Sequence, residues 1–165
     1  MAHVLGWIWC WVCFGSSVST LCWAIFTSAL VVLSRIDLKH MLLPDVITLP
    51  LLWLGFIFSD MGFTPATLSQ SMWGAVMGYS LFFGMNVAYR RIRGINGLGL
   101  GDAKLLSALL AWLGWQTIQP LILMACSSAL FTSLMLRLGY NKHELRIPFG
   151  PHLALAGAAM MMRWA

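Results

Sequence analysis

Residues 19–36 read STLCWAIFTSALVVLSRI, an almost unbroken apolar stretch whose only charged residue is Arg35. About 20 apolar residues is the length that a helix needs to cross the hydrocarbon core of a bilayer. The whole chain has this character: of its 165 residues, 60% are apolar and 9% are charged, whereas about 25% are charged in soluble domains. A soluble domain of this size cannot bury so much apolar surface. The composition therefore predicts an all-α, polytopic membrane protein and excludes a soluble enzyme, a disordered chain and a disulfide-rich secreted domain.

Short polar clusters divide the sequence into apolar runs, each of which predicts a helix. The runs cover roughly residues 4–14, 19–36, 46–58, 72–89, 103–118, 121–138 and 148–162. The first run is short and is followed by Gly15-Ser16-Ser17, so it is compatible with a full span, half of a broken span or a segment at the membrane interface. We expect six or seven transmembrane helices in a single domain, residues 1–165.

The basic residues are distributed asymmetrically along these runs. Nine of the ten lie around the connections after the second, fourth and sixth runs, namely Arg35, Lys39, Arg90, Arg91, Arg93, Lys104, Arg137, Lys142 and Arg146. Alternate connections lie on one side of a membrane, and cytoplasmic loops carry the excess of Lys and Arg. The pattern therefore places these connections in the cytoplasm and explains the net charge of +5. No nucleic-acid partner is expected, because no basic stripe interleaves with exposed aromatic residues.

The cysteine and histidine residues do not predict a metal site. Cys10 and Cys13 form a CxxC pair, but within an apolar run, and Cys22 and Cys126 are isolated. A structural zinc site takes four ligands, usually from two spaced pairs in polar loops. The four histidines are scattered along the chain. We therefore expect no bound metal and interpret the cysteines as buried apolar residues.

Asp37 follows the second run, at the predicted end of a helix. A carboxylate at a helix C-terminus is opposed by the helix macrodipole, so stability alone does not favour it there. One interpretation is an ion pair with Arg35 or Lys39. The other is a functional role, because an ionisable residue at the edge of an apolar span is a functional candidate.

Asp45 and Asp102 each precede an apolar run on the same predicted side. Both are compatible with helix N-caps, in which a carboxylate accepts hydrogen bonds from exposed backbone N–H groups. Asp102 ends the segment Gly97-Leu98-Gly99-Leu100-Gly101-Asp102, whose glycines allow a sharp turn and close approach to another surface. The segment is not a phosphate-binding loop, because no strand precedes it and the Lys-Ser/Thr pair is missing. The other acidic residues, expected to be solvated, are Asp60 and Glu144.

Asp37 and Asp102 end and begin two different spans at the same membrane face. If the two helices are neighbours, their carboxyl groups share one site, and two carboxyls in a partly dry site do not both ionise readily. One then polarises a water molecule while the other protonates the departing group. This is the chemistry of an aspartic protease.

Three elements of the sequence resemble those of a known family. Residues 36–55, which read IDLKHMLLPDVITLPLLWLG, resemble the first signature of bacterial type IV prepilin peptidases. Residues 97–106, GLGLGDAKLL, resemble the GxGD element of the same family, and Ile147-Pro148-Phe149-Gly150-Pro151 is similar to a short element near its C-terminus. The elements occur in the family's order, and the resemblance covers roughly residues 20–160.

The resemblance implies an inner-membrane, multi-pass aspartic endopeptidase with its active site at the cytoplasmic face. Such enzymes remove the leader, after a glycine, from type IV prepilins and from pseudopilins of type II secretion, which are the implied partners together with membrane lipid. The family's catalytic aspartates correspond to Asp37 and Asp102, which leaves Asp45 a supporting residue. Gly99 and Gly101 are expected to let the loop approach an extended substrate. Lys104 is expected either to tune the aspartate pair or to contact lipid phosphate.

The sequence departs from longer family members at its N-terminal side. Those members carry a cytoplasmic region with two CxxC pairs and also N-methylate the new N-terminus of the pilin. Only about 36 residues, mostly apolar, precede Asp37 here, so we interpret the chain as a short form without that region. No cofactor is expected for proteolysis, and S-adenosylmethionine is expected only if methylation is retained.

Two other functional classes are compatible with the residues before the resemblance is considered. A small membrane transporter uses ionisable residues near the middle of its spans, whereas the acidic residues here lie near the ends of runs. A non-catalytic component of a pilus or secretion assembly does not require both aspartates. The oligomeric state and the particular substrate are not predicted by the sequence.

Overall fold

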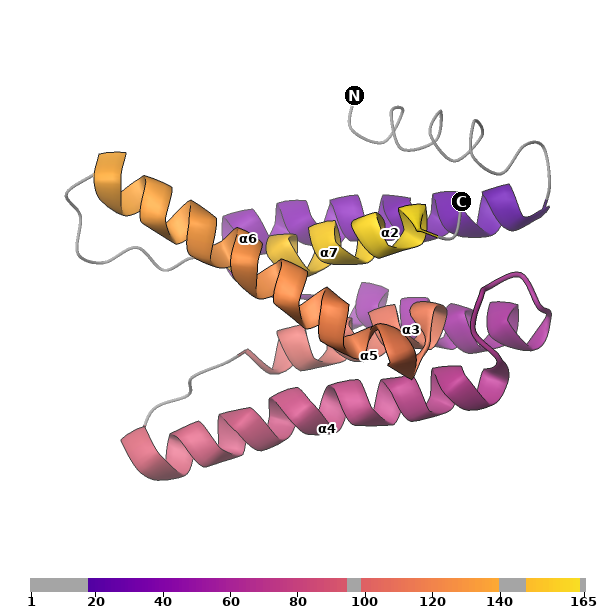
Figure 1. Cartoon of the computed structure of the whole chain (residues 1–165), viewed down its shortest axis with the longest axis horizontal. Helices are drawn as coiled ribbons and strands as arrows, with labels where there is room; N and C mark the ends of the chain where they lie inside the picture. The colour runs from indigo at the N-terminus through magenta and orange to yellow at the C-terminus, as the bar shows by residue number, and fades with distance from the viewer. Residues whose placement is uncertain (1–17, 95–98, 140–147, 164–165) are drawn as a thin grey trace.

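The computed structural model describes residues 18–94, 99–139 and 148–163, and every regular element in these ranges is helical (Figure 1). The elements are α2 (Val18–His40), α3 (Asp45–Asp60), α4 (Leu68–Arg93), α5 (Leu100–Leu113), the single 3-10 turn η1 (Trp115–Thr117), α6 (Ile118–Gly139) and α7 (Gly150–Met162). The all-α prediction is confirmed for this part of the chain. The run at 4–14, with Cys10 and Cys13, lies outside the described residues.

The predicted runs correspond to the helices with one clear exception. The sequence predicts one continuous helix over 103–118, but α5 ends at Leu113 and η1 and α6 follow. The break falls at Gly114, whose φ of 80° is rarely adopted by residues with a side chain. A Cβ at this position would also lie 3.1 Å from Cβ of Ala66. Gly114 therefore ends α5 and turns the chain toward α6.

The helices are arranged so that the C-terminal ends of α2, α4 and α6 and the N-terminal ends of α3, α5 and α7 face the same end of the molecule, left in Figure 1. We call this the basic end, because the described basic residues near it include Arg35, Lys39, Arg90, Arg91 and Lys104. For these helices, the alternate connections thus lie at one end of the molecule, as their predicted position on one side of a membrane requires. Asp60 is exposed at the other end.

Helix α5 is the centre of the fold. From Ala103 onward every residue of α5 except Lys104 is buried, and the helix packs against α3, α4 and α7. Near its C-terminus the Trp112 ring packs among aromatic rings of two other helices, with ring-centroid distances of 4.9 Å to Phe26 and 5.3 Å to Phe58. The Trp112 indole N–H donates a 2.8 Å hydrogen bond to the carbonyl oxygen of Leu51, so this buried polar atom is satisfied. These contacts anchor α5 and fix where its N-terminal turn lies.

The contact between α4 and α5 depends on small residues of α4. A Cβ at Gly74 would lie 2.8 Å from the carbonyl oxygen of Leu110, and one at Gly78 would lie 2.7 Å from Cδ1 of the same leucine. Two glycines four residues apart lie on one helix face and let two helix backbones approach closely. The Ser107 hydroxyl adds a 2.9 Å hydrogen bond to the carbonyl oxygen of Ala75. Sequence reasoning overlooked this GxxxG spacing, which lies within the predicted fourth run.

Two of the described helices are long and apolar enough to cross a membrane, over Ser19–His40 and Trp115–Leu136. The prediction of six or seven spans is therefore not confirmed as a count. Several large apolar side chains of α6 point outward, among them Leu123, Leu130 and Phe131, each more than 60% exposed. A helix that exposes such side chains on its outer face is typical of a surface that contacts lipid or another protein.

Candidate active site

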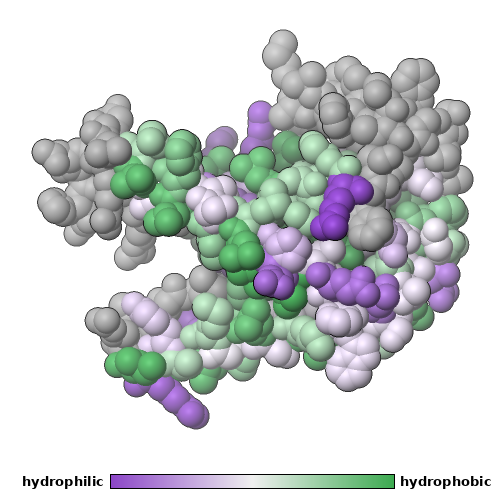
Figure 2. All heavy atoms as spheres, in the orientation of Figure 1, coloured by the Kyte–Doolittle hydropathy of each residue, from purple (hydrophilic) through white to green (hydrophobic). Residues whose placement is uncertain are grey.

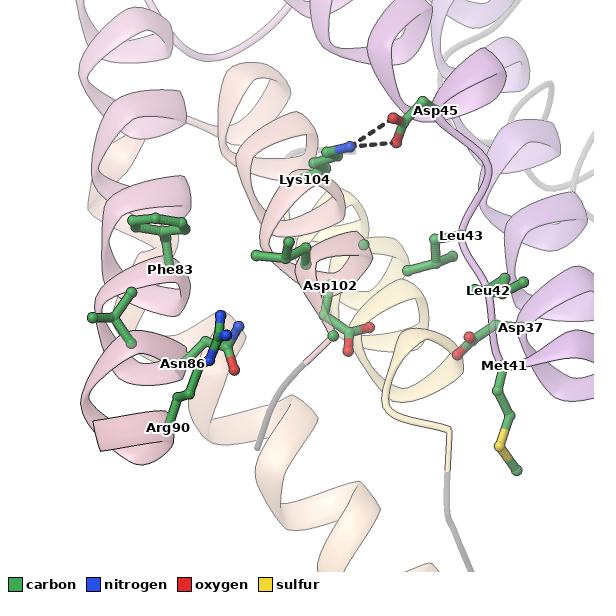
Figure 3. Close-up of a pocket in the computed structure, with 14 residues that line it drawn as sticks. Asp37, Met41, Leu42, Leu43, Asp45, Phe83, Asn86, Arg90, Asp102 and Lys104 are labelled. Atoms are coloured by element: carbon green, nitrogen blue, oxygen red, sulfur yellow. Dashed lines mark hydrogen bonds and ion pairs between the residues drawn. The ribbon is translucent and has the colours of Figure 1, made fainter. Parts of the chain in front are cut away.

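A cavity of about 530 Å³ lies at the basic end, where Figure 2 shows the molecule hollowed. Its walls come from the C-terminal turn of α2, the connection to α3, the C-terminal half of α4 and the first turn of α5. The lining residues are Asp37, Met41, Leu42, Leu43, Asp45, Phe83, Asn86, Val87, Arg90, Gly99, Leu100, Gly101, Asp102 and Lys104 (Figure 3). Both aspartates that the sequence singled out, and all four of the supporting residues, thus lie around one cavity.

Asp37 lies inside the last turn of α2 and is only 5% exposed. Its carboxylate accepts a 3.0 Å hydrogen bond from the backbone N–H of Gly150, the first residue of α7. The unfavourable position at the end of one helix is thus offset by the favourable N-terminus of another. In the described part of the chain the only ion pair joins Lys104 and Asp45, so the interpretation that Asp37 pairs with Arg35 or Lys39 is wrong.

Helix α2 ends at a residue with an unusual backbone. Met41 has a φ of 51°, in the left-handed region that non-glycine residues adopt at a cost of about 1–2 kcal/mol. Its N–H donates a 2.8 Å hydrogen bond to the carbonyl oxygen of Asp37, which closes the helix. Pro44 follows shortly and cannot continue a helix. Asp37 therefore stands beside the point where the chain leaves α2 and enters the cavity wall.

Asp102 lies in the first turn of α5, outside the two candidate membrane spans. Gly99, not Asp102, is the N-cap residue, so the N-cap interpretation of Asp102 is wrong. The Asp102 carboxylate instead turns back toward the backbone of Gly99. Burial, together with the negative charge of Asp37, raises the pKa of Asp102 to about 7, although the hydrogen bond from the Gly99 backbone opposes this shift. Near neutral pH Asp102 is therefore poised to gain or lose a proton.

The carboxyl groups of Asp37 and Asp102 point toward one another across the cavity in Figure 3. They come from α2 and α5, two helices that are separated along the chain by α3 and α4. The electrostatic effect of Asp37 on Asp102 shows that the two are close enough for the charge of one to alter the protonation of the other. The arrangement therefore provides an acid and a base facing a common space.

Asp45 and Lys104 form an ion pair at the rim of this cavity. The Lys104 Nζ lies 2.7 Å and 2.6 Å from the two carboxylate oxygens of Asp45 (Figure 3). Asp45 is the first residue of α3. The N-cap of this helix is Pro44, and no side chain accepts a capping hydrogen bond there, so the N-cap interpretation of Asp45 is wrong. Lys104 was expected to tune the aspartate pair or to contact lipid phosphate, and the structure shows it bound to Asp45 instead.

Gly101 provides close contact within the chain. A Cβ at Gly101 would lie 2.9 Å from Cβ of Leu43, so the connection between α2 and α3 packs directly on the first turn of α5. This contact brings the segments that carry Asp37 and Asp102 together. Gly99 is exposed at the cavity wall. Gly97 lies outside the described residues.

Sequence reasoning missed the partner of Asp37. Gly150 belongs to the Pro-Phe-Gly-Pro element, which was quoted for its resemblance but was given no role. The signal was present, because a glycine between Phe149 and Pro151 at the start of a helical run indicates close backbone approach. Arg90 and Asn86 of α4, which also line the cavity, were not singled out either. Their helix was predicted, but its apolar pattern does not show which turn faces α5.

Within the described residues no group of three or more His, Cys, Asp or Glu side chains is placed to hold a metal ion. His152 is buried, and its Nδ1 lies 3.2 Å from the hydroxyl of Ser128. Glu144, His3 and His143 lie outside the described residues. The described titratable side chains that line the cavity are Asp37, Asp45, Arg90, Asp102 and Lys104.

A helical protein that holds two aspartates of different helices against one cavity has the elements of an aspartic protease site. Comparison with known proteins gives the family. The Type IV leader peptidase family matches residues 24–136, a segment that includes Asp37 and Asp102, and the chain belongs to this family. The resemblance noted in the sequence is thereby confirmed. No solved structure matches the chain.

Curated relatives carry the name "Prepilin leader peptidase/N-methyltransferase". The protein of Stutzerimonas stutzeri is 41% identical over 145 residues, which cover 87% of this chain and 50% of that protein. The protein of Aeromonas hydrophila is 43% identical over 139 residues, covering 84% and 48%. The protein of Pseudomonas aeruginosa is 44% identical over 135 residues, covering 81% and 46%. The chain thus spans about half the length of the curated relatives it matches.

Proposed function

We propose that this chain is an aspartic endopeptidase that removes the leader peptide from type IV prepilins or type II secretion pseudopilins on the cytoplasmic side of the membrane. The observation that carries the proposal is that Asp37 and Asp102, on different helices, face one cavity. Family membership and the names of the relatives support the substrate class.

The two carboxyl groups supply complementary proton transfers. The ionised carboxylate takes a proton from a water molecule as the water oxygen attacks the scissile carbonyl carbon, and the protonated carboxyl gives its proton to the carbonyl oxygen. Collapse of the tetrahedral intermediate breaks the C–N bond. The departing nitrogen receives the proton that came from water. One hydroxyl group of the intermediate gives its proton back to the other aspartate as the carbonyl re-forms, and the pair returns to its starting state.

The cavity wall fits an extended apolar segment better than a basic one. Met41 and Leu42 are exposed at the rim, and Phe83 lines the opposite wall. Arg90 on the same cavity repels basic leader residues, whereas the charge of Lys104 is paired with that of Asp45. Recognition then depends mainly on the apolar helix of the substrate, which packs between helices in the bilayer, and on backbone contacts near Gly99 and Gly101.

The proposed location is the bacterial inner membrane, with several spans in a single domain and the basic end in the cytoplasm. The two long apolar helices and the clustering of basic residues at one end support it. The leader of a prepilin lies in the cytoplasm while its apolar helix enters the bilayer. The cavity at the basic end is therefore on the side where the scissile bond is presented.

N-methylation of the new N-terminus is a second activity in the names of the relatives. It requires S-adenosylmethionine as the methyl donor, whereas the proteolytic step uses only water and the two aspartates. We propose proteolysis as the activity of the residues described here and treat methylation as a separate property that the same experiment measures.

The proposal is tested by co-expressing the chain with a candidate prepilin in cells that lack their own prepilin peptidase and measuring the mass of the pilin. Loss of the leader mass that depends on the chain is the expected result, and an additional gain of one methyl group would reveal the second activity. A panel of prepilins and pseudopilins that all keep their full mass, while the chain is present in the membrane, would contradict the proposal.

A further inference from the structure

Helix α7 begins against the side chain of Asp37. The backbone N–H of Gly150, its first residue, donates the 3.0 Å hydrogen bond to Oδ2 of Asp37. The next residue, Pro151, has no N–H, and the N–H groups of His152 and Leu153 bind the carbonyl oxygen of Phe149. Among the first residues of α7, Gly150 is thus the one whose N–H binds the Asp37 carboxylate.

There is no room for a side chain at this position. A Cβ on Gly150 would lie 2.5 Å from Oδ2 and 3.0 Å from Cγ of Asp37, closer than non-bonded atoms approach. The carboxylate is also buried, so its orientation is set by this contact rather than by solvent. Since a buried carboxylate needs hydrogen-bond donors to remain charged, the Gly150 N–H favours the ionised form.

The two aspartates therefore differ in surroundings. Asp37 receives its donor from the start of a separate helix, and its negative charge acts on Asp102. Asp102 accepts its backbone hydrogen bond from Gly99 at the start of its own helix, and burial together with the charge of Asp37 outweighs this bond and disfavours its charged form. The other charged side chains that line the cavity are Lys104 and Asp45, which bind each other, and Arg90 of α4.

We propose that Gly150 is the positioning residue of Asp37: its N–H holds the Asp37 carboxylate ionised and aimed into the cavity, so that Asp37 is the base of the pair and Asp102 the acid. This inference rests on the proposed endopeptidase function and assigns the roles within it. The Pro-Phe-Gly-Pro element then affects the reaction by fixing the orientation of Asp37, which belongs to the first of the three sequence elements.

The test compares Gly150→Ala with Gly157→Ala. Both change a glycine of α7 into alanine, and both place a Cβ against a close neighbour, but the neighbour of Gly157 is the flexible end of Leu109, 2.6 Å away. For purified protein acting on a prepilin, we expect Gly150→Ala to lower kcat about tenfold or more, because a displaced catalytic carboxylate is no longer oriented for the reaction. KM should change much less than kcat. Gly157→Ala should lower thermal stability without a fall in kcat of this kind.

The pH profile separates positioning from packing. Alanine keeps its backbone N–H, but its Cβ pushes the Asp37 carboxylate away from that donor, which disfavours the ionised base. The acidic limb of kcat/KM for Gly150→Ala should therefore move to higher pH by roughly one to two units. A second variant replaces Gly150 by glycolic acid through nonsense suppression, which exchanges the N–H for an ester oxygen and adds no side chain. The ester variant should show the same shift to higher pH. If Gly150→Ala fails to fold, the ester variant alone tests the role of the Gly150 N–H.

The outcomes distinguish the two claims. A wild-type chain that cleaves no prepilin would contradict the proposed function itself. A wild-type chain that cleaves, together with an ester variant whose pH profile and kcat match the wild type, would overturn the role of Gly150 and leave the endopeptidase proposal intact. A shift of the acidic limb in the ester variant, with Gly157→Ala unshifted, supports the inference.

Discussion

At the scale of single residues, the carboxyl group of Asp37 lies where α2 ends and α7 begins. Charge at the end of α2 is unfavourable, and the N–H of Gly150 compensates for it. Asp102 lies in the first turn of α5, where burial and the charge of Asp37 act together on its protonation. The proposed reaction depends on this difference, because one group has to give a proton while the other takes one.

The raised pKa of Asp102 gives stability a defined pH dependence. The folded protein holds the proton with a pKa of about 7, whereas an unfolded chain holds it with a pKa of about 3.9. The contribution to stability is therefore full below about pH 4 and is lost as the pH rises to about 7. We expect Asp102→Asn to melt above the wild type at pH 8 in detergent micelles, and the two melting temperatures to converge near pH 4.

The matched control for this measurement is Asp60→Asn, which changes an exposed aspartate at the opposite end of the molecule. Its melting temperature relative to the wild type should not follow the same course with pH. If the difference between Asp102→Asn and the wild type is the same at pH 4 and pH 8, the raised pKa is refuted.

The ion pair between Lys104 and Asp45 should contribute little to stability. The two side chains are 31% and 52% exposed, and exposed pairs are typically worth about 0.2–1 kcal/mol. A double-mutant cycle of Lys104→Met and Asp45→Asn, measured by thermal unfolding, should give a coupling in this range that falls as salt is added. A coupling above about 2 kcal/mol that ignores salt would show that the pair is shielded from solvent and that its role is structural.

The sequence pointed to both aspartates because so few acidic residues occur and each could be weighed by its place at the end of a run. The resemblance to the family then separated them from Asp45. The sequence did not predict that Asp45 binds Lys104, because the two are 59 positions apart and the pattern of runs does not show which helix starts lie together. Gly150 was overlooked for the same reason, since its role depends on a contact between the first and last described helices.

At the scale of elements, the central position of α5 between α3 and α4 brings the first turn of α5 to the cavity. The close approach of α4 is possible because Gly74 and Gly78 have no side chain there. The apolar runs predicted the helices, since each run has the length and composition of a buried or lipid-facing helix. The end of α5 at Gly114 was missed, because a single glycine in an apolar run is also tolerated inside a helix.

The packing of α4 on α5 is tested by Gly74→Ala. The new Cβ would lie 2.8 Å from the carbonyl oxygen of Leu110 and 3.0 Å from the backbone nitrogen of Trp115, and backbone atoms cannot move aside cheaply. We expect a loss of roughly 1–3 kcal/mol in stability, measured by denaturation in micelles. The control is Gly84→Ala on the same helix, where a Cβ meets nothing within 4 Å.

Gly84→Ala should be neutral or stabilising by up to about 1 kcal/mol, because alanine is the better helix former. Equal losses of stability in Gly74→Ala and Gly84→Ala would contradict the close approach of the two helices. They would show instead that α4 responds to any added methyl group along its length.

At the scale of the whole molecule, most of the described basic residues lie at the same end as the cavity. The described Lys and Arg residues, apart from Arg163, gather at the end where the cavity lies, and the positive-inside rule supports the proposal that this end faces the cytoplasm. The aromatic packing around Trp112 lies toward the other end of α5, away from the aspartates. The fold thus places the aromatic packing and the cavity toward opposite ends of α5.

The orientation is tested with single cysteines in a chain whose four natural cysteines are replaced. A membrane-impermeant thiol reagent added to spheroplasts should label Asp60→Cys, at the end opposite the cavity. It should label Arg91→Cys, an exposed position at the basic end, only after the membrane is opened. Labelling of Arg91→Cys in sealed spheroplasts, with Asp60→Cys protected, would reverse the proposed topology.

The central claim is that Asp37 and Asp102 together cleave a prepilin, and the most direct measurement is the mass of a co-expressed pilin that the wild-type chain processes. Asp37→Asn and Asp102→Asn should each leave the leader in place while the protein remains in the membrane at its normal level. Asp60→Asn should process the pilin as the wild type does. Leader removal by either of the first two variants would contradict the account.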